Sequence, residues 1–363
     1  MSKFLIDRFS NLEPYVPGEQ PKEKKYIKLN TNEAPYPPSP NVVDAIDKAV
    51  VAGLNLYCDP DTTKLTKIIA DFYDVDFNQV FIGNGSDEVL AFIMMAFVDE
   101  KTKVCFPDIT YGFYRVFSKS FALDAKEVPL KDDLTIDIND YINCGRNIII
   151  ANPNAPTGLV LTHEEIEKIL VSNQDRVVVI DEAYVDFGSK SCIELLDKHS
   201  NLIVVQTFSK SRNLAGARIG FAIASKEIIE DLNKMKFSIT PYNINTMSQI
   251  AGVESVKDND YFEDCNKRVI ATRERTKKEL RKLGFRVTDS KTNFIFVTHD
   301  SISGKEYYSE LRKHGILTRH FNDKRINEYV RISIGTDEEM DKVIEATKKI
   351  LDEAMDYDFV VAK

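Results

Sequence analysis

The sequence has no long apolar run. Its first apolar stretch, Phe4-Leu5-Ile6, is shorter than the hydrophobic segment of a secretory signal, and no later stretch approaches the length that crosses a bilayer. Internal repeats and low-complexity segments are also absent. These absences predict a cytoplasmic protein without a membrane partner.

Cysteine is scarce, and positive charge does not predominate. The net charge of −9, with acidic and basic residues interspersed, argues against nucleic acid or an anionic membrane as the main partner. An anionic ligand must therefore bind local arginines. The five cysteines are odd in number and lack the close spacing of a metal site, so we expect reduced, non-catalytic thiols and no metal. They are Cys58, Cys105, Cys144, Cys192 and Cys265.

At 363 residues the chain exceeds the usual size of one hydrophobic core, so we expect two domains. Residues 1–40 hold seven prolines and predict an extended arm. Between residues 41 and 255, apolar runs alternate with helical patterns, which predicts a large α/β domain with a mostly parallel sheet. Residues 256–363 change to a long charged helix, near 261–283, and short strands, which predicts a smaller α+β domain.

Individual elements also have signals. Apolar runs predict strands at 104–106, 148–150, 177–180, 202–205, 219–222, 285–287, 294–297 and 330–334. Capping boxes predict helix starts at Thr162 with Glu165 and at Thr336 with Glu339. The buried helix faces that we expect are Leu65, Ile68, Ile69 and Phe72, and then Met340, Val343, Ile344, Thr347 and Leu351.

The segment Ser209 to Gly220 places Lys210 and Arg218 in glycine-containing, otherwise apolar sequence. Lys210 follows the predicted strand 202–205, at the strand end where open α/β sheets bind ligands. A primary amine held there can condense with an aldehyde. The alternative for Lys210 alone is an ordinary solvated lysine.

Three further loops follow predicted strands or precede a predicted helix. Asp181 closes the strand 177–180 and could hold a cationic ring nitrogen, or it could simply cap the next helix. In the loop 152–158, Asn154 could donate to a phenolic oxygen, although the segment is also an ordinary turn. The segment 83–88 exposes backbone amides at a helix start, which suits an anion, but it lacks the lysine of a Walker loop.

Together these loops offer a phosphate site, an acid for a ring nitrogen, a donor for a ring oxygen and a lysine for an aldehyde, which are the four features of pyridoxal 5'-phosphate. Over nearly its whole length the chain resembles the fold-type I pyridoxal-phosphate aminotransferases, and among them the histidinol-phosphate aminotransferases. The segments that carry the resemblance are 12–18, 29–33, 152–158, 181–184 and 209–220. It implies a mostly parallel seven-stranded sheet sandwiched by helices, a smaller α+β domain and a homodimer with shared active sites.

The resemblance also implies residue roles. Lys210 would bond to the cofactor aldehyde, Asp181 would pair with the ring nitrogen, and Tyr184 and Asn154 would contact the ring hydroxyl. Tyr111 would stack on the ring. The residues implied to bind the cofactor phosphate are Gly85, Ser86, Ser209, Arg218 and, from the neighbouring subunit, Tyr57, and Asp87 is also expected to bind the cofactor.

Arg331 lies in a predicted strand among apolar residues, an expensive place for a charge without an anion. The resemblance implies that Arg331, Arg319, Tyr15 and Asn154 bind substrate, while an intramolecular salt bridge is the alternative for Arg319. Ala34 and Ala155 depart from the asparagine that the family more often has.

The implied reaction transfers an amino group between histidinol phosphate and 2-oxoglutarate, giving imidazole-acetol phosphate and glutamate in histidine biosynthesis. An aromatic amino acid aminotransferase and a decarboxylase of a phosphorylated amino acid, of the threonine-phosphate type, remain alternatives on the same fold. A cofactor-binding regulator without turnover is a third, but the chain has neither an added DNA-binding segment nor a basic arm.

Overall fold

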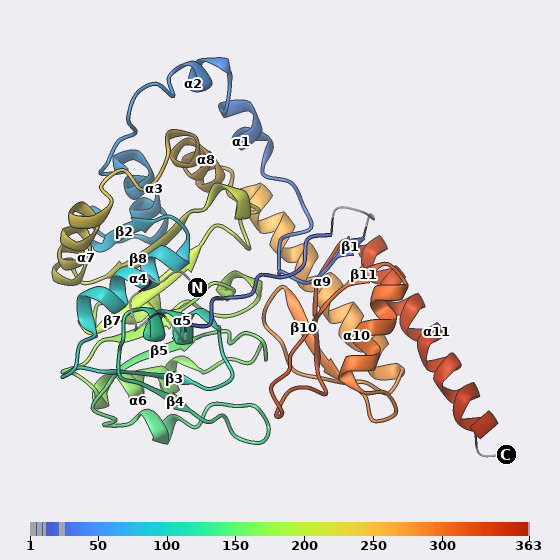
Figure 1. Cartoon of the computed structure of the whole chain (residues 1–363). Helices are drawn as coiled ribbons and strands as arrows, with labels where there is room; N and C mark the ends of the chain where they lie inside the picture. The colour runs from blue at the N-terminus through green and yellow to red at the C-terminus, as the bar shows by residue number, and fades with distance from the viewer. Residues whose placement is uncertain (1–4, 6–8, 10–11, 22–25, 362–363) are drawn as a thin grey trace.

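A seven-stranded mixed sheet forms the centre of the larger part of the molecule (Figure 1). The computed structural model describes residues 5, 9, 12–21 and 26–361. In spatial order the strands are β2 (Val80–Gly83), β8 (Gly220–Ala224), β7 (Leu202–Thr207), β6 (Val178–Asp181), β5 (Asn147–Ala151), β3 (Val104–Pro107) and β4 (Ala125–Val128). Strand β8 alone runs opposite to the other six strands, so the predicted mostly parallel sheet is confirmed.

Helices cover both faces of this sheet. Apolar residues of α4 (Ser86–Phe97), α5 (Phe113–Ser120) and α7 (Lys226–Ile239) pack on one face. The opposite face is covered by α6 (His163–Ser172), α3 (Thr63–Tyr73) and α8 (Thr246–Lys257). Short 3-10 helices lie in the connections: η2 (Phe77–Gln79), η3 (Ile138–Tyr141), η4 (Val185–Phe187), η5 (Cys192–Leu195) and η6 (Ala215–Ala217). Burial on both faces explains why these strands are continuous apolar runs.

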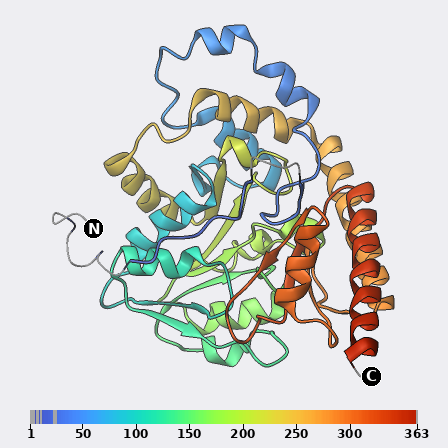
Figure 2. The same cartoon turned by 45° about the vertical axis from the view of Figure 1, so that its right-hand side comes forward.

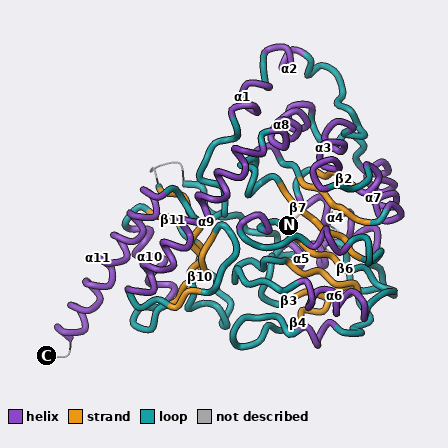
Figure 3. Tube along the Cα trace, turned by 180° about the vertical axis from the view of Figure 1, so that it is seen from behind, coloured by secondary structure: helices purple, strands orange, loops and turns teal. Residues whose placement is uncertain are grey.

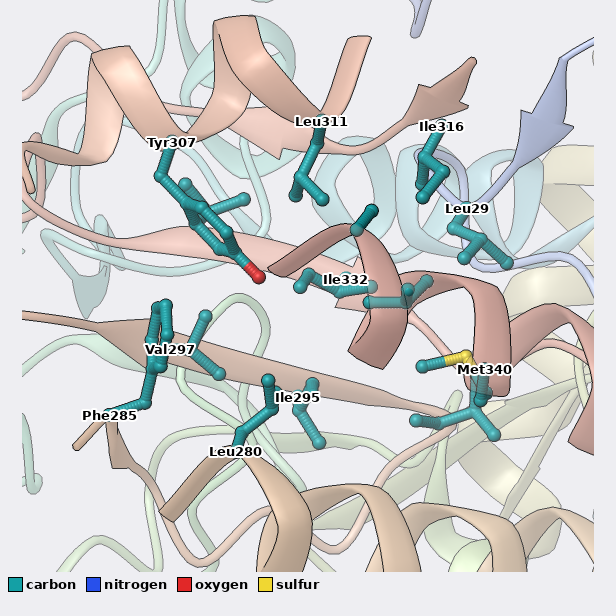
Figure 4. Close-up of a cluster of buried hydrophobic side chains, with 14 of the residues drawn as sticks. Leu29, Leu280, Phe285, Ile295, Val297, Tyr307, Leu311, Ile316, Ile332 and Met340 are labelled. Atoms are coloured by element: carbon teal, nitrogen blue, oxygen red, sulfur yellow. The ribbon is translucent and has the colours of Figure 1, made fainter. Parts of the chain in front are cut away.

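A four-stranded antiparallel sheet organises the C-terminal part. Its strands, in order, are β12 (Arg319–His320), β13 (Val330–Ser333), β10 (Phe294–Thr298) and β9 (Arg286–Val287). Three helices pack with it: α9 (Asn259–Lys282), α10 (Gly304–Lys313) and α11 (Asp337–Val361). Figure 4 shows their shared core, in which Leu280, Leu311 and Met340 from the three helices surround Ile295 and Ile332. The backbone of α11 continues outward to the C-terminus (Figure 3).

The proline-rich N-terminal segment runs between the two sheets (Figure 2). Its strand β1 (Ile27–Lys28) pairs in parallel with β11 (Ile316–Leu317), and Ser333 N donates to Leu29 O over 3.0 Å. The segment then rises to α1 (Pro40–Ala45) and α2 (Lys48–Ala52), which project at the top of Figure 1. Segment 26–33 is thereby tied to the C-terminal part.

Most element predictions are confirmed, including both capping boxes, in which Thr162 N and Thr336 N donate to the glutamate three residues on. One expected buried residue is wrong: Phe72 is 39 % exposed, because it lies at the rim of α3 beneath the Arg212 guanidinium. No helix within the described ranges is long and apolar enough to cross a membrane. The proposed domain boundaries near residues 40 and 255 stay a prediction.

Candidate active site

A cavity opens at the carboxyl ends of β6 and β7, where the chain leaves the sheet. Asp181 ends β6, and Lys210 follows the end of β7 by three residues. The residues that line the cavity are Ser86, Asp87, Tyr111, Ala151, Ala155, Asp181, Ala183, Tyr184, Thr207, Ser209, Lys210 and Arg218. The structure therefore brings together nine of the residues singled out in the sequence.

Asp181 is a buried carboxylate, 4 % exposed. Its Oδ2 accepts a 2.6 Å hydrogen bond from the Tyr114 hydroxyl, and its Oδ1 accepts from Ala183 N over 3.2 Å. Burial raises the pKa of Asp181 to about 6, and the two hydrogen bonds oppose that rise. Such a carboxylate is prepared to pair with a cation that enters the cavity.

Lys210 reaches the cavity from the loop after β7. Its Nζ donates to Thr31 O over 3.3 Å and lies 5.8 Å from the centre of the Tyr184 ring. No carboxylate forms an ion pair with Lys210 among the described residues. The amine is therefore held by one weak hydrogen bond between the N-terminal segment and the large sheet.

An anion-binding arrangement lies at the start of α4. Gly85 precedes the helix with a φ of +81°, and a Cβ at that position would lie 2.3 Å from Arg218 Nη2. Arg218 itself donates to Asp87 Oδ2 over 3.0 Å and to Ser209 Oγ over 3.4 Å. The free amides of a helix start, two serine hydroxyls and a guanidinium suit a phosphate. Glycine at position 85 lets the arginine approach the helix start.

Of the two residues expected at a ring hydroxyl, Tyr184 lines the cavity and Asn154 does not. The Tyr184 hydroxyl lines the cavity and accepts a 3.0 Å hydrogen bond from Asn32 Nδ2. The Asn154 amide donates to Ile109 O over 3.0 Å and to Thr157 Oγ1 over 3.1 Å, and its Oδ1 accepts from Thr110. Asn154 therefore fixes the loop after β3, and its role toward a cofactor stays a prediction.

Tyr111 forms one wall of the cavity. Its hydroxyl donates to Asp87 Oδ1 over 2.7 Å, which joins it to the Arg218 side of the site. Its ring lies edge-on to the Tyr114 ring, with the ring centres 5.7 Å apart. The Tyr114 hydroxyl in turn donates to Asp181. This hydroxyl contact orients the ring that we expect to stack on a cofactor.

A second pocket adjoins the first, sharing Tyr111, Ala155, Tyr184 and Lys210. Arg319, Arg331 and Tyr15 line it. The Arg331 Nη2 donates to Asn30 O over 3.1 Å, but its buried Nε has no hydrogen-bond partner in the described part of the chain. Burial lowers the pKa of Arg331. Arg319 has no ion pair among the described residues, so the salt bridge considered as its alternative role is not formed there.

Tyr57 lies outside both pockets. It is 84 % exposed and stacks on Tyr242 with ring centres 4.6 Å apart. The structure thus does not bring Tyr57 to the cavity of its own chain.

Sequence patterns missed two side chains of the site. Tyr114 holds Asp181 from α5, and Asn32 joins Tyr184 to the Ser333 hydroxyl, which donates to Asn32 Oδ1 over 2.8 Å. Asn32 has a φ of +56°, a backbone conformation that asparagine adopts more readily than most residues. An asparagine in a proline-rich segment was therefore the one sequence signal for this turn. Tyr114 had no comparable signal in the sequence.

Comparison with known proteins agrees with this arrangement. Residues 24–346 match the family model of class I and II aminotransferases. A histidinol-phosphate aminotransferase of Brachyspira hyodysenteriae is 53 % identical, covering 97 % of this chain and 99 % of the relative. One from Clostridium acetobutylicum is 49 % identical, covering 97 % and 100 %. The solved histidinol-phosphate aminotransferase of Sinorhizobium meliloti, in complex with pyridoxal-5'-phosphate, shares the fold with a TM-score of 0.87 at 24 % identity, covering 97 % and 100 %. The chain belongs to the class I and II aminotransferase family.

Proposed function

We propose that the chain is a pyridoxal-phosphate-dependent histidinol-phosphate aminotransferase of histidine biosynthesis. It transfers an amino group from histidinol phosphate to 2-oxoglutarate, giving imidazole-acetol phosphate and glutamate, and it catalyses the reverse reaction. Relatives of that name are 53 % and 49 % identical over 97 % of the chain. The structural observation that carries the proposal is a single cavity lined by Asp181, Lys210 and Arg218, which adjoins a pocket with two arginines.

The residues present fit the cofactor. A buried carboxylate with a raised pKa matches a ring nitrogen that must stay protonated, and Ser86, Ser209 and Arg218 supply donors for a phosphate. When bound, the cofactor supplies an electron-withdrawing ring conjugated to the reacting carbon. Asp181 would hold the proton on the ring nitrogen, and Tyr111 would pack against the ring.

Lys210 has two tasks in this proposal. Its Nζ would hold the cofactor through the aldehyde in the resting enzyme, and as a free amine it would carry a proton from the amine-bearing carbon of the substrate. The 3.3 Å contact with Thr31 O and the Tyr184 ring, 5.8 Å away, would keep the free amine inside the cavity. A lysine without a competing ion pair is available for both tasks.

Arg319 and Arg331 serve the anionic group of each substrate. The unpartnered Nε of Arg331 has a hydrogen to donate, and a carboxylate or phosphate can accept from it and from the neighbouring Nη2. Glutamate and histidinol phosphate each bring an anionic group to this pocket in turn. Tyr15 closes the pocket from the N-terminal segment, where it packs 4.4 Å from Phe113.

We also infer a homodimer with shared sites, in the cytoplasm. Exposed apolar side chains lie on α2 and the loop after it, and on the end of α7 and the loop after that. The two loops meet where Tyr57 stacks on Tyr242, and a second copy would cover this exposure. They are Val51, Leu54, Leu56, Tyr57, Phe237, Ile239 and Tyr242. All five cysteines are free thiols, which suits a reducing compartment.

Turnover with paired substrates tests the proposal. Purified protein with added cofactor is incubated with histidinol phosphate and 2-oxoglutarate, and glutamate formation is measured. We expect rapid formation of glutamate, and none with Lys210→Ala. Phosphothreonine consumed with release of carbon dioxide would support the decarboxylase alternative, and turnover of phenylalanine or tyrosine alone would support an aromatic aminotransferase.

A further inference from the structure

Cys105 and Cys144 are distant in the sequence but lie close together in the structure. Their Sγ atoms are 3.9 Å apart, although 39 residues separate them in the chain. Cys105 belongs to β3 and is buried on the sheet face that packs against α6. Cys144 lies in the connection between η3 and β5 and is partly exposed. A buried thiol and an accessible thiol thus face each other at the surface of the large sheet.

The two sulfur atoms have unequal surroundings. The hydrogen bond between the two sulfur atoms lowers the pKa of Cys144 and raises the pKa of Cys105. Lys126 of β4 is the register partner of Cys105, so a cation flanks the pair on the same face. The remaining contacts of the Cys144 Sγ are Arg146 O at 3.6 Å and Asn173 Oδ1 at 3.7 Å. Cys144 is the more exposed of the two thiols, so a small oxidant reaches it first, and Cys105 is placed as its resolving partner.

Access and movement also favour the pair. Gly145 follows Cys144 with a φ of +68°, and a Cβ there would meet nothing within 4 Å. The connection is therefore open at Gly145, the residue next to Cys144 in the chain. A disulfide needs the sulfur atoms about 2 Å apart, so they must approach by about 2 Å, a shift that an open loop beside a fixed strand can make.

We propose that Cys105 and Cys144 form a reversible disulfide when the protein meets a hydroperoxide. The Cys144 thiol loses its proton, and the thiolate attacks the terminal peroxide oxygen. The O–O bond breaks, Cys144 becomes a sulfenic acid, and the leaving oxygen takes up a proton and departs as an alcohol, or as water from hydrogen peroxide. The Cys105 thiol then attacks the Cys144 sulfur, the S–O bond breaks, and water leaves with the Cys105 proton. Two electrons pass from the two thiols to the peroxide. The site is separate from the amino-transfer cavity and does not depend on the proposed substrate.

Peptide mapping after oxidation tests the proposal. The cofactor-loaded protein is reduced, freed of reductant, treated with hydrogen peroxide at neutral pH, alkylated and digested. We expect a peptide pair joined through Cys105 and Cys144, lighter by two hydrogens than the separate peptides, and a fall from five to three alkylatable thiols. Dithiothreitol should restore all five. Cys58→Ser should still form the link, whereas Cys144→Ser should not.

Two results would overturn the proposal. One is oxidation of Cys144 to its sulfinic acid with no linked peptide, which would mean that the Cys105 thiol does not resolve it. The other is a link that appears only after denaturation or that joins other cysteines. Because Cys144 is partly exposed, Cys144→Ser should fold normally, and an unchanged melting temperature under reducing conditions checks this.

Discussion

Arg319 and Arg331 stand directly opposite each other across the antiparallel pair of β12 and β13. Their guanidinium carbons lie 5.9 Å and 5.8 Å from the centre of the same Phe321 ring. Like charges in register on neighbouring strands destabilise a sheet, and a buried cation without a counter-ion costs more. The arrangement is explained if an anionic substrate group binds between them during turnover.

Replacing Arg331 with glutamine should therefore weaken substrate binding without lowering the stability of the folded protein. We expect kcat/KM for histidinol phosphate to fall about 100- to 1,000-fold, because a buried donor pair to an anion is lost. The substrate-free protein should melt at an equal or higher temperature, since an uncompensated cation is removed. Arg286→Gln is the matched control, because Arg286 lies in the same sheet but pairs with exposed Asp300. A normal kcat/KM in Arg331→Gln would refute the role.

Asp181→Asn should make the cofactor-free protein more stable at neutral pH. Burial raises the pKa of Asp181 from 3.8 to about 6, so the folded chain binds this proton more tightly than the unfolded chain. The free energy of unfolding therefore falls as pH rises from about 4 through about 6, because Asp181 loses its proton. Above that range Asp181 lowers the free energy of unfolding by about 3 kcal/mol. Denaturant unfolding at pH 8 and at pH 4 should show this gain at pH 8 only.

The same variant should lose activity with cofactor present. Asparagine cannot hold the proton on a ring nitrogen, and removing such electrostatic support costs on the order of 100- to 1,000-fold in kcat. An Asp181→Asn enzyme with wild-type kcat would contradict the assignment of Asp181.

Tyr114→Phe should lower activity by removing a hydrogen bond to Asp181. It removes the 2.6 Å hydrogen bond that stabilises the charged form of Asp181, a contribution of about 1.5–3 kcal/mol. The pKa of Asp181 should rise further, so we expect kcat/KM to fall about tenfold or more, with the larger loss near pH 6. Tyr141→Phe is the control, because Tyr141 is equally buried but its hydroxyl has no partner in the described residues.

Mixed dimers test whether Tyr57 acts across the subunit interface. Lys210→Ala and Tyr57→Phe chains are each expected to be impaired, and the two are unfolded together, refolded and separated as hybrids by different affinity tags. If Tyr57 serves the partner's site, one site of each hybrid has both native residues, and activity should recover to about half of the wild-type value. If Tyr57 served its own chain's site, no site would be native and the hybrids would stay impaired.

The sequence predicted what local patterns encode and missed what distant contacts decide. Runs such as Val177 to Ile180 indicate buried strands because both faces of the sheet are covered. Strand β4 escaped notice because it lies at the sheet edge and exposes Lys126 and Glu127. The antiparallel direction of β8 has no local signal. Likewise, the motif around Lys210 predicted its loop, whereas the contact of Asn32 with Tyr184 joins residues 152 positions apart.

The most direct test of the account asks which lysine carries the cofactor. The cofactor-loaded protein is reduced with borohydride and digested, and the peptide with the added cofactor mass is sequenced. We predict the added mass on Lys210 alone, and its loss when glutamate is supplied first without an acceptor, because the amino group then passes to the cofactor and frees the lysine. Cofactor mass on another lysine, or on none, would contradict the assignment of this cavity.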